Sequence, residues 1–227
     1  MKAIILAAGE GLRMRPLTLT TPKPLITVHG KTLLEHLVLK FPKEVDELIL
    51  VVGYLGEKIE KYCGTNFMGR PVTYVWQREK LGTYHALELC RPLLQEEETF
   101  LVFYSDDIVD GISIKRLLKY PLAVICQRVA DPRRFGVIVV DEDDLITEIV
   151  EKPEAPTSNL AMASGIKIST AIFDYKPVPH HKNGEYYLSV AISQMAKTHK
   201  IRAIEANFWF PLATPEDIAA AEKNGLI

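Results

Sequence analysis

Two glycines and three cations follow the first apolar run of the chain, in an order suited to phosphate binding. Gly9 and Gly11 lack the Cβ atoms that would keep backbone N–H groups away from phosphate oxygens. Arg13, Arg15 and Lys23 then add positive charge to the same stretch. The pattern predicts a loop that binds phosphate, although glycines in a strand-to-loop turn are also common where no ligand binds.

Two well-known phosphate-binding loops do not match this spelling. A dinucleotide-binding fingerprint requires a third glycine at a position that is Met14 in this chain. A P-loop requires Gly-Lys-Ser or Gly-Lys-Thr, whereas Leu12 and Arg13 follow Gly11. The loop therefore belongs to another class of phosphate site.

Paired carboxylates end an apolar strand at FYSDD, residues 103–107. Asp106 and Asp107 can hold a divalent cation that bridges nucleotide phosphates, because hard cations prefer carboxylate oxygens. Strand-ending aspartates are also frequent in turns and helix caps, so the pair by itself leaves both interpretations open.

Short apolar runs alternate with helical periodicity up to about residue 120. Strands that are apolar throughout and separated by helices indicate a parallel sheet covered on both faces. In such a sheet ligands bind beyond the carboxyl ends of the strands, which places the loop after Ala8 at the site. The expected strands are 3–8, 47–53, 72–77 and 99–107, and the expected helices are 31–41, 54–63 and one that begins near Thr83.

The second part of the chain has strands with little room for helices between them. We predict a single α/β domain over residues 1–227, with a mostly parallel, Rossmann-like mixed sheet flanked by helices. Residues up to about 120 form a nucleotide-binding half, and residues from about 121 form a mixed half that shapes a second substrate pocket. The later strands are 122–129, 135–141, 145–150 and 201–206, with an exposed turn at 141–144, a helix at about 186–198 and a last helix from Thr214.

Local signals support several of these helices. Thr32 and Glu35 have the spacing of a capping box, and Thr214 followed by Pro215 is typical of a helix start. Apolar residues at helical spacing predict which side of each helix is buried. The predicted stripes are Leu33, Leu34, Leu37 and Val38 in the first helix, Leu55, Ile59 and Tyr62 in the second, and Leu188, Ile192 and Met195 in the helix near 190.

Composition excludes some classes of protein. The chain has 227 residues, 48% of them hydrophobic, and a net charge of -2, which argues against a nucleic-acid binder that relies on overall basicity. Cys63, Cys90 and Cys126 are unevenly spaced, so we expect buried small residues in a reducing cytosol. The apolar run at 3–8 is too short for a signal peptide or a membrane span. We therefore expect a cytoplasmic protein with no membrane partner.

The stretch LAAGEGLRMRPLTLTTPKPL, residues 6–25, closely resembles the signature of the sugar-phosphate nucleotidyltransferases. That family spells it as an apolar strand followed by A-A/G-G-x-G-x-R, P-x-T and P-K-P-L, and every fixed position matches. The family that this stretch resembles includes glucose-1-phosphate thymidylyltransferases and N-acetylhexosamine-1-phosphate uridylyltransferases. It implies that Arg13 and Lys23 are catalytic residues on a triphosphate. The nucleotide contacts it implies are Leu6, Ala7, Ala8, Gly9, Gly11 and Tyr104.

Residues 77–87, QREKLGTYHAL, resemble the segment with which this family reads the base. The resemblance implies that Gln77, Gly82 and Thr83 contact the nucleotide. A glutamine amide offers a donor and an acceptor together, which suits the imide edge of uracil or thymine. Relatives that use guanine tend to carry another residue at this position, so Gln77 favours UTP or dTTP. The alternative is that Gln77 is merely the polar end of a strand.

Residues 131–153, DPRRFGVIVVDEDDLITEIVEKP, resemble the family's sugar-binding segment. The resemblance implies that Gly136, Glu151 and Lys152 bind the sugar phosphate, together with Gly165 in MASGIKI. The chemistry agrees, because a carboxylate can accept paired sugar hydroxyls and an ammonium group can neutralise a phosphate monoester.

The family also implies a Mg²⁺ ion on Asp106, where relatives usually have Gly-Asp and this chain has Ser105 before the acid. Two further positions depart from the family pattern. Ala163 stands where relatives have an asparagine that contacts the sugar. Pro211 stands in WFPLATP where relatives have an aspartate as second metal ligand, and Ala213 replaces a glycine. Asp107, a water shell or Asn207 could compensate for the missing acid.

These features predict an enzyme that transfers a nucleotidyl group from UTP or dTTP to a sugar 1-phosphate and releases pyrophosphate. The partners expected are a nucleoside triphosphate and a sugar 1-phosphate, with a possible homo-oligomer. Two alternatives remain: a nucleotide-sugar-binding regulatory homologue with weak or no turnover, and a cytidylyl- or guanylyltransferase of the same fold.

Overall fold

The computed structural model describes residues 1–223 of the chain, and its centre is a ten-stranded sheet. Four parallel neighbours lie at its core in the order β7-β1-β4-β6, as the alternating apolar runs predicted. Their bounds are β1 (Lys2–Ala7), β4 (Glu47–Val52), β6 (Arg70–Trp76) and β7 (Thr99–Tyr104), and the short β5 (Asn66–Phe67) ends the sheet beside β6.

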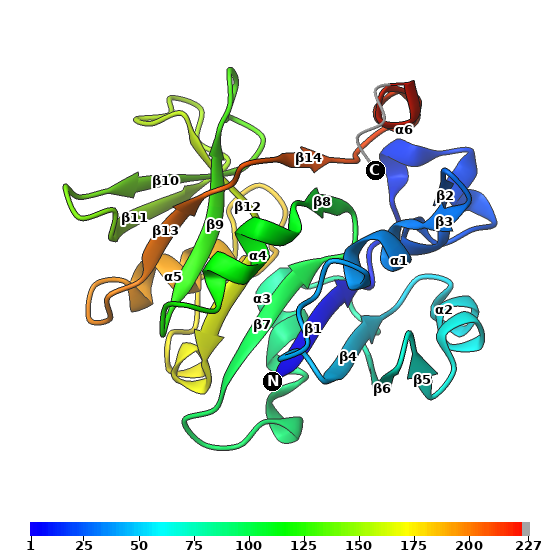
Figure 1. The fold of residues 1–227 in the computed structure, drawn as a ribbon. Coiled ribbons are helices and arrows are strands. Elements are labelled where there is room, and N and C mark those ends of the chain that lie inside the picture. Colours follow the sequence, from blue (N-terminus) through cyan, green and yellow to red (C-terminus); the bar gives the residue numbers. More distant parts are fainter. Residues whose placement is uncertain (224–227) are drawn as a thin grey trace.

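The ten-residue strand β12 (Leu160–Ser169) joins the parallel part to the mixed part. It lies antiparallel to β9 along one edge, and along its other edge it lies antiparallel to β10 at Ala161 and to β7 from Ile166 to Ser169. The remaining strands of this part are β9 (Ala123–Arg128), β10 (Gly136–Val140), β11 (Ile146–Glu151) and β13 (Arg202–Glu205). The predicted fold class is therefore confirmed, as one mixed α/β sheet in one domain (Figure 1).

Helices cover both faces of the sheet because the parallel strands are apolar on both sides. On β1, Ile4 and Leu6 face the core that α3 and α5 complete, whereas Ala3 and Ile5 face the core of α1, α2 and α4. Figure 1 shows these helices around the sheet. Their bounds are α1 (Leu33–Val38), α2 (Gly56–Cys63), α3 (Thr83–Glu88), α4 (Gly111–Leu117) and α5 (Leu188–Met195).

Most predicted helix faces are confirmed, and one residue is wrong. The capping box between Thr32 and Glu35 forms as expected. Tyr62 is 46% exposed, and Cys63 is buried beside Ile59 instead. The reason is that Leu55 takes a left-handed conformation and precedes α2 rather than belonging to it. The helices predicted at 31–41 and 186–198 are shorter, at Leu33–Val38 and Leu188–Met195.

A third core holds the loop after β1 against the last helix, α6 (Pro215–Lys223). Met14 from the loop and Val28, which follows the loop, pack with Ile218 of α6. Figure 1 shows α6 next to two short strands, β2 (Thr27–Val28) and β3 (Lys31–Thr32). Segments from the two ends of the chain thus support the same loop.

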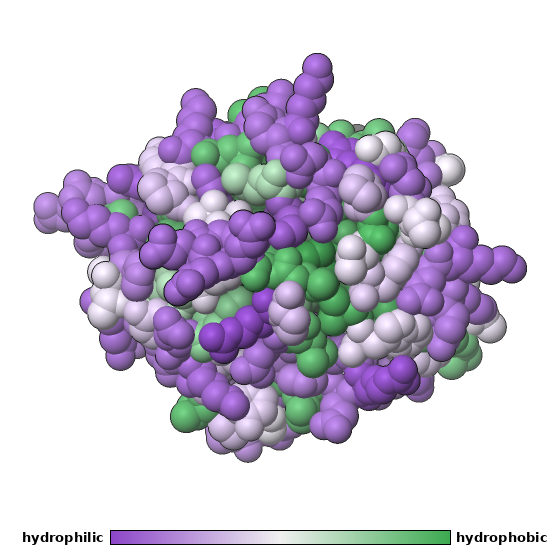
Figure 2. All heavy atoms as spheres, turned by 90° about the horizontal axis from the view of Figure 1, so that it is seen from below, coloured by the Kyte–Doolittle hydropathy of each residue, from purple (hydrophilic) through white to green (hydrophobic). Residues whose placement is uncertain are grey.

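The three cysteines are buried and unpaired, as predicted. Burial raises the pKa of each thiol to about 12, so none of them is a reactive nucleophile. Within residues 1–223, every helix falls short of the length and apolarity that crossing a bilayer requires. Seen from below, the surface is largely hydrophilic, with hydrophobic side chains gathered near the middle of the view (Figure 2).

Candidate active site

Two adjoining cavities lie at the carboxyl end of β1 and β7. From β1 the chain continues to β4 and β6 on one side of the sheet, and then returns to form β7 on the other side of β1. Open α/β sheets bind ligands at such a switch point between strands. The first cavity, of about 580 Å³, follows the loop after β1 and reaches Gln77. The second, of about 360 Å³, reaches Glu151 and Lys152. The residues that line both are Arg13, Thr83, Tyr104, Asp106 and Ala213.

The loop after β1 is shaped around Gly11. Its φ is +60°, and a Cβ atom there would lie 3.0 Å from the Thr18 side chain and 3.3 Å from the Cβ atom of Lys23. The Gly11 carbonyl accepts hydrogen bonds from the Thr18 hydroxyl at 2.8 Å and the Met14 N–H at 2.8 Å. The turn that requires glycine therefore also brings Lys23 to the cavity.

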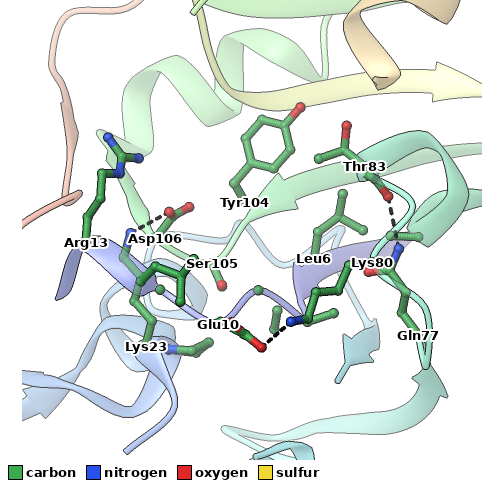
Figure 3. A pocket seen from close by; sticks show the side chains of 18 of the residues that line it. Leu6, Glu10, Arg13, Lys23, Gln77, Lys80, Thr83, Tyr104, Ser105 and Asp106 are labelled. Atoms are coloured by element: carbon green, nitrogen blue, oxygen red, sulfur yellow. Dashed lines mark hydrogen bonds and ion pairs between the residues drawn. The ribbon is translucent and has the colours of Figure 1, made fainter. Parts of the chain in front are cut away.

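Lys23 and Asp106 form an ion pair at the floor of the first cavity. The Nζ atom of Lys23 lies 2.6 Å from Asp106 Oδ2. The lysine side chain is 9% exposed, whereas the aspartate side chain is 38% exposed and faces the cavity. Arg13 lies beside them, and within residues 1–223 no hydrogen bond or ion pair engages its guanidinium group (Figure 3).

Asp107 differs from Asp106 because it is tied to the protein. It begins β8 (Asp107–Val109), which pairs with β14 (Trp209–Pro211). Its Oδ2 accepts hydrogen bonds from the Trp209 indole at 2.9 Å and the Ser164 N–H at 3.1 Å. Burial and the adjacent charge of Asp106 raise the pKa of Asp107 to about 7.

Gln77 lies at the far end of the first cavity from Arg13 and Asp106 (Figure 3). Its amide nitrogen donates to the Gly82 carbonyl at 3.0 Å. Between the two ends, Leu6 and Tyr104 form the wall. Glu10 and Lys80 pair across the opening, and this pair is one feature that the sequence did not reveal.

In the second cavity a hydrogen-bonded group surrounds Lys152. Its Nζ atom lies 2.9 Å from the Tyr187 hydroxyl and 3.4 Å from Glu151 Oε1. Burial opposes the charge of Lys152, but these two groups outweigh it and raise its pKa above the ordinary value. Glu151 Oε2 accepts a hydrogen bond from the Ser189 hydroxyl at 2.6 Å. Tyr187 and Ser189 come from the segment GEYYLS, to which the sequence alone assigned no role.

The structure brings nearly all the predicted site residues to these cavities. The first cavity contains Leu6, Ala7, Ala8, Gly9, Gly11, Arg13, Lys23, Gln77, Gly82, Thr83, Tyr104 and Asp106, and the second contains Gly136, Glu151 and Lys152. Gly165 is the exception, because it lines neither cavity. It is buried in β12, where a Cβ atom would lie 2.6 Å from the Ile125 side chain. Its role in sugar binding stays a prediction.

The residues that depart from the family pattern lie in different parts of the structure. Ala163 is fully buried in the core of α1, α2 and α4, outside both cavities. Pro211 lines the second cavity near Asp106 and Asp107. Asn207 is exposed, and its N–H donates to the Ser113 hydroxyl before the start of β14, whereas Pro211 is at the other end of that strand. Asn207 is therefore badly placed to replace the missing acid.

The donors present suit a cation shared with a ligand better than a cation held by protein alone. Among residues 1–223 no three histidine, cysteine or acidic side chains are grouped so that they could hold a metal ion together. Asp106 offers a partly exposed carboxylate in the cavity that the glycine-rich loop after β1 lines. Mg²⁺ is usually bound through one or two carboxylates together with substrate phosphates, and Asp106 fits that pattern.

The sequence profile of the nucleotidyl transferase family matches residues 2–224. The chain belongs to this family. Among the curated members of the nucleotidyl transferase family, the "Bifunctional protein GlmU" of Methanocaldococcus jannaschii is 38% identical over 226 residues, which are 98% of this chain and 54% of that protein. The "UTP--glucose-1-phosphate uridylyltransferase AglF" of Haloferax volcanii is 35% identical over 237 residues, with 98% of this chain and 96% of that protein covered.

A solved structure shares the nucleotidyl transferase fold. It is a putative glucose-1-phosphate thymidylyltransferase from Bacillus anthracis in complex with a sucrose, with a TM-score of 0.84 and 26% identity. The match covers 99% of this chain and 94% of that one. The chain spans about half the length of the archaeal GlmU proteins that it matches.

Proposed function

We propose that this protein transfers a nucleotidyl group from UTP or dTTP to a sugar 1-phosphate, with release of pyrophosphate. The observation that carries the proposal is that two cavities of unlike lining meet at Arg13 and Asp106. The first cavity is lined by the glycine-rich loop after β1 and the Gln77 amide. The second is lined by the Glu151 carboxylate and the Lys152 ammonium group. The named activities of the AglF protein and of the thymidylyltransferase structure support it.

In this proposal residues up to about 120 bind the nucleotide and residues from about 121 bind the sugar phosphate. Both cavities contain residues from each of these two halves. Ala213 reaches the first cavity, and Arg13 reaches the second. Each half therefore contributes to the place where the two substrates meet.

Catalysis consists of positioning and charge neutralisation. The sugar-phosphate oxygen attacks the α-phosphorus in line, and the bond from that phosphorus to the pyrophosphate oxygen breaks. Arg13 and Lys23 stabilise the negative charge on the triphosphate, while Lys152 holds the attacking phosphate and Glu151 accepts sugar hydroxyls. Mg²⁺ held by Asp106 and the phosphates supplies further positive charge when bound.

The test is pyrophosphate release with Mg²⁺ across UTP, dTTP, CTP, GTP and ATP, each with a panel of sugar 1-phosphates that includes glucose 1-phosphate. Lys23→Met and Asp106→Asn should each lower the rate by at least about 100-fold, because both act on the reacting phosphates. The control is Lys31→Met, which removes an exposed lysine outside both cavities. Full activity of either variant would refute the assignment of that residue.

A regulatory protein that binds nucleotide sugars is the second candidate, and Pro211 is the observation that favours it. A proline side chain cannot coordinate a cation, so the position of the family's second metal acid carries no ligand. Binding of UTP and a nucleotide sugar without pyrophosphate release would support this candidate. Release with CTP or GTP in preference to UTP and dTTP would instead indicate the cytidylyl- or guanylyltransferase alternative.

A further inference from the structure

We propose that His85 is a positioning residue for base selection, which acts by fixing the amide of Gln77 with its oxygen toward the base. The inference rests on the proposed function, because it concerns the base of the nucleotide in the first cavity. His85 does not line that cavity, whereas Gln77 does. The imidazole is therefore not a direct contact of the nucleotide, and the cavity side chain that it touches is the Gln77 amide.

Both hydrogens of the Gln77 amide nitrogen have acceptors. Nε2 donates to the Gly82 carbonyl at 3.0 Å and lies 3.1 Å from His85 Nδ1. An amide nitrogen cannot accept a hydrogen bond, so His85 Nδ1 is the acceptor and the ring proton is on Nε2. The Gln77 side-chain oxygen is then the group left for the base.

The Gly82 carbonyl that orients the amide is itself held in place. Gly82 has φ of +93°, and a Cβ atom there would lie 2.5 Å from the Tyr186 carbonyl oxygen. On either side of it, the Tyr84 N–H donates to Tyr186 O at 2.9 Å and the Tyr186 N–H donates to Leu81 O at 2.8 Å. The amide is thus held between a fixed carbonyl and a ring nitrogen.

The position of His85 is set by α3. It lies in the first turn of this helix, between Tyr84 and Ala86, which are 1% and 3% exposed. Its carbonyl accepts a hydrogen bond from the Leu89 N–H at 3.1 Å. The imidazole therefore approaches Gln77 from a packed element rather than from a loop.

An accepting oxygen that faces N3 of the base distinguishes uracil and thymine from cytosine. Uracil and thymine present an N3–H donor to it, whereas cytosine presents a lone pair at N3 and is repelled. To suit cytosine the amide must turn over, which breaks the hydrogen bond to Gly82 and points Oε1 at its carbonyl, and which keeps a hydrogen bond to His85 only if the ring proton moves from Nε2 to Nδ1. Without the His85 acceptor only the bond to Gly82 resists this turn, so discrimination against CTP falls.

The test compares His85→Leu, which removes the acceptor, with His85→Asn, whose Oδ1 atom replaces Nδ1 at the same position of the side chain. Dissociation constants for UTP and CTP are measured by calorimetry on the whole chain. We expect His85→Leu to weaken UTP binding about tenfold and to reduce the ratio of UTP to CTP affinity, and His85→Asn to stay within about threefold of wild type. His85→Ala serves as a second variant without the acceptor if the leucine does not fold.

Two further comparisons separate this role from a structural one. In a Gln77→Ala background, His85→Leu should cause no further loss of UTP affinity, because its target is gone. Glu88→Ala, one turn further along α3, is the matched control and should bind UTP like wild type. Equal losses in His85→Leu and His85→Asn, additive losses with Gln77→Ala, or wild-type protein that binds CTP as tightly as UTP would overturn the inference.

Binding measurements also keep this inference separate from the proposed function. A protein that binds UTP over CTP through Gln77 and His85 but releases no pyrophosphate would refute nucleotidyl transfer and leave the role of His85 supported. Turnover with no preference between UTP and CTP would do the reverse.

Discussion

Asp107 and Pro211 are directly opposed residues in the antiparallel pair of β8 and β14. Cross-strand neighbours in such a pair lie on the same face, so the proline at the position where the resemblance implied a second metal acid adjoins a carboxyl group. That carboxylate is already bound by Trp209 and the Ser164 N–H. The position on β14 that carries no acid is therefore paired with a buried carboxyl group on β8, whose pKa is raised to about 7.

Restoring an acid at Pro211 should make the protein responsive to divalent cations. Without a cation, Pro211→Asp places a new carboxylate beside the carboxyl groups of Asp106 and Asp107 and should lower the free energy of unfolding by about 1 kcal/mol. With Mg²⁺ and UTP this loss should reverse, because the cation neutralises the cluster. The measurement is thermal unfolding in EDTA and in excess Mg²⁺ with UTP.

Pro211→Asn is the matched control, since it changes the backbone in the same way and adds no charge. If the asparagine and aspartate variants respond equally to Mg²⁺, the position has no part in cation binding.

Lys23 and Asp106 should show strong energetic coupling. Asp106→Asn leaves the buried Lys23 ammonium without its partner and should cost about 2 kcal/mol of stability. Lys23→Met should cost less, because Asp106 is partly exposed to water. The double variant should be about as stable as Lys23→Met alone, measured by urea unfolding. Additive losses would contradict the ion pair.

The two glycines of the loop after β1 should respond differently to alanine. Gly11→Ala forces a left-handed alanine against Thr18 and Lys23 and should cost about 1–2 kcal/mol of stability. Gly9 has open space around its Cα, so Gly9→Ala should change stability by less than about 0.5 kcal/mol. Because Gly9 lines the first cavity, its methyl group should nevertheless weaken UTP binding.

Thermal unfolding and UTP calorimetry on both variants check this contrast. A Gly9→Ala protein that binds UTP normally would place the phosphates away from this residue. A fully stable Gly11→Ala protein would show that the loop tolerates another conformation.

Asp110 should make stability depend on acid pH. Burial opposes its ionisation, but hydrogen bonds from the side chain and N–H of Ser113 and from the Phe208 N–H outweigh this and lower its pKa below 3.8. The folded state then binds fewer protons than the unfolded state, so the stabilisation is complete above about pH 4 and is lost as pH falls through the folded pKa. Asp110→Asn should lose about 1 kcal/mol at neutral pH, and the deficit should shrink below pH 4.

Urea unfolding between neutral and strongly acid pH measures this effect. Glu142→Gln, in the exposed turn after β10, is the control and should leave the profile unchanged. Asp110 is the N-cap residue of α4. A constant deficit at every pH would mean that it stabilises this helix start without any contribution from its charge.

Much of the fold can be read from the sequence because the signals are short in range. Continuous apolar runs indicate buried strands, and the capping box at Thr32 and Glu35 forms within one turn of helix. Tyr62 was misplaced because the start of α2 depends on the left-handed conformation of Leu55, which no local pattern encodes. The loop from Gly9 to Lys23 could be recognised because its residues are close in sequence.

Only the tertiary structure decides how distant segments meet. Asp107 and Pro211 are opposed because β14 returns to pair with β8, and Tyr187 reaches Lys152 because α5 packs against β11. The sequence shows Gln77 as an amide with both a donor and an acceptor to offer. Packing of α3 uses the donor on Gly82 and His85, and among residues 1–223 the Gln77 side-chain oxygen accepts no hydrogen bond. Residue types are local, but which of their hydrogen bonds remain free depends on the neighbours that folding provides.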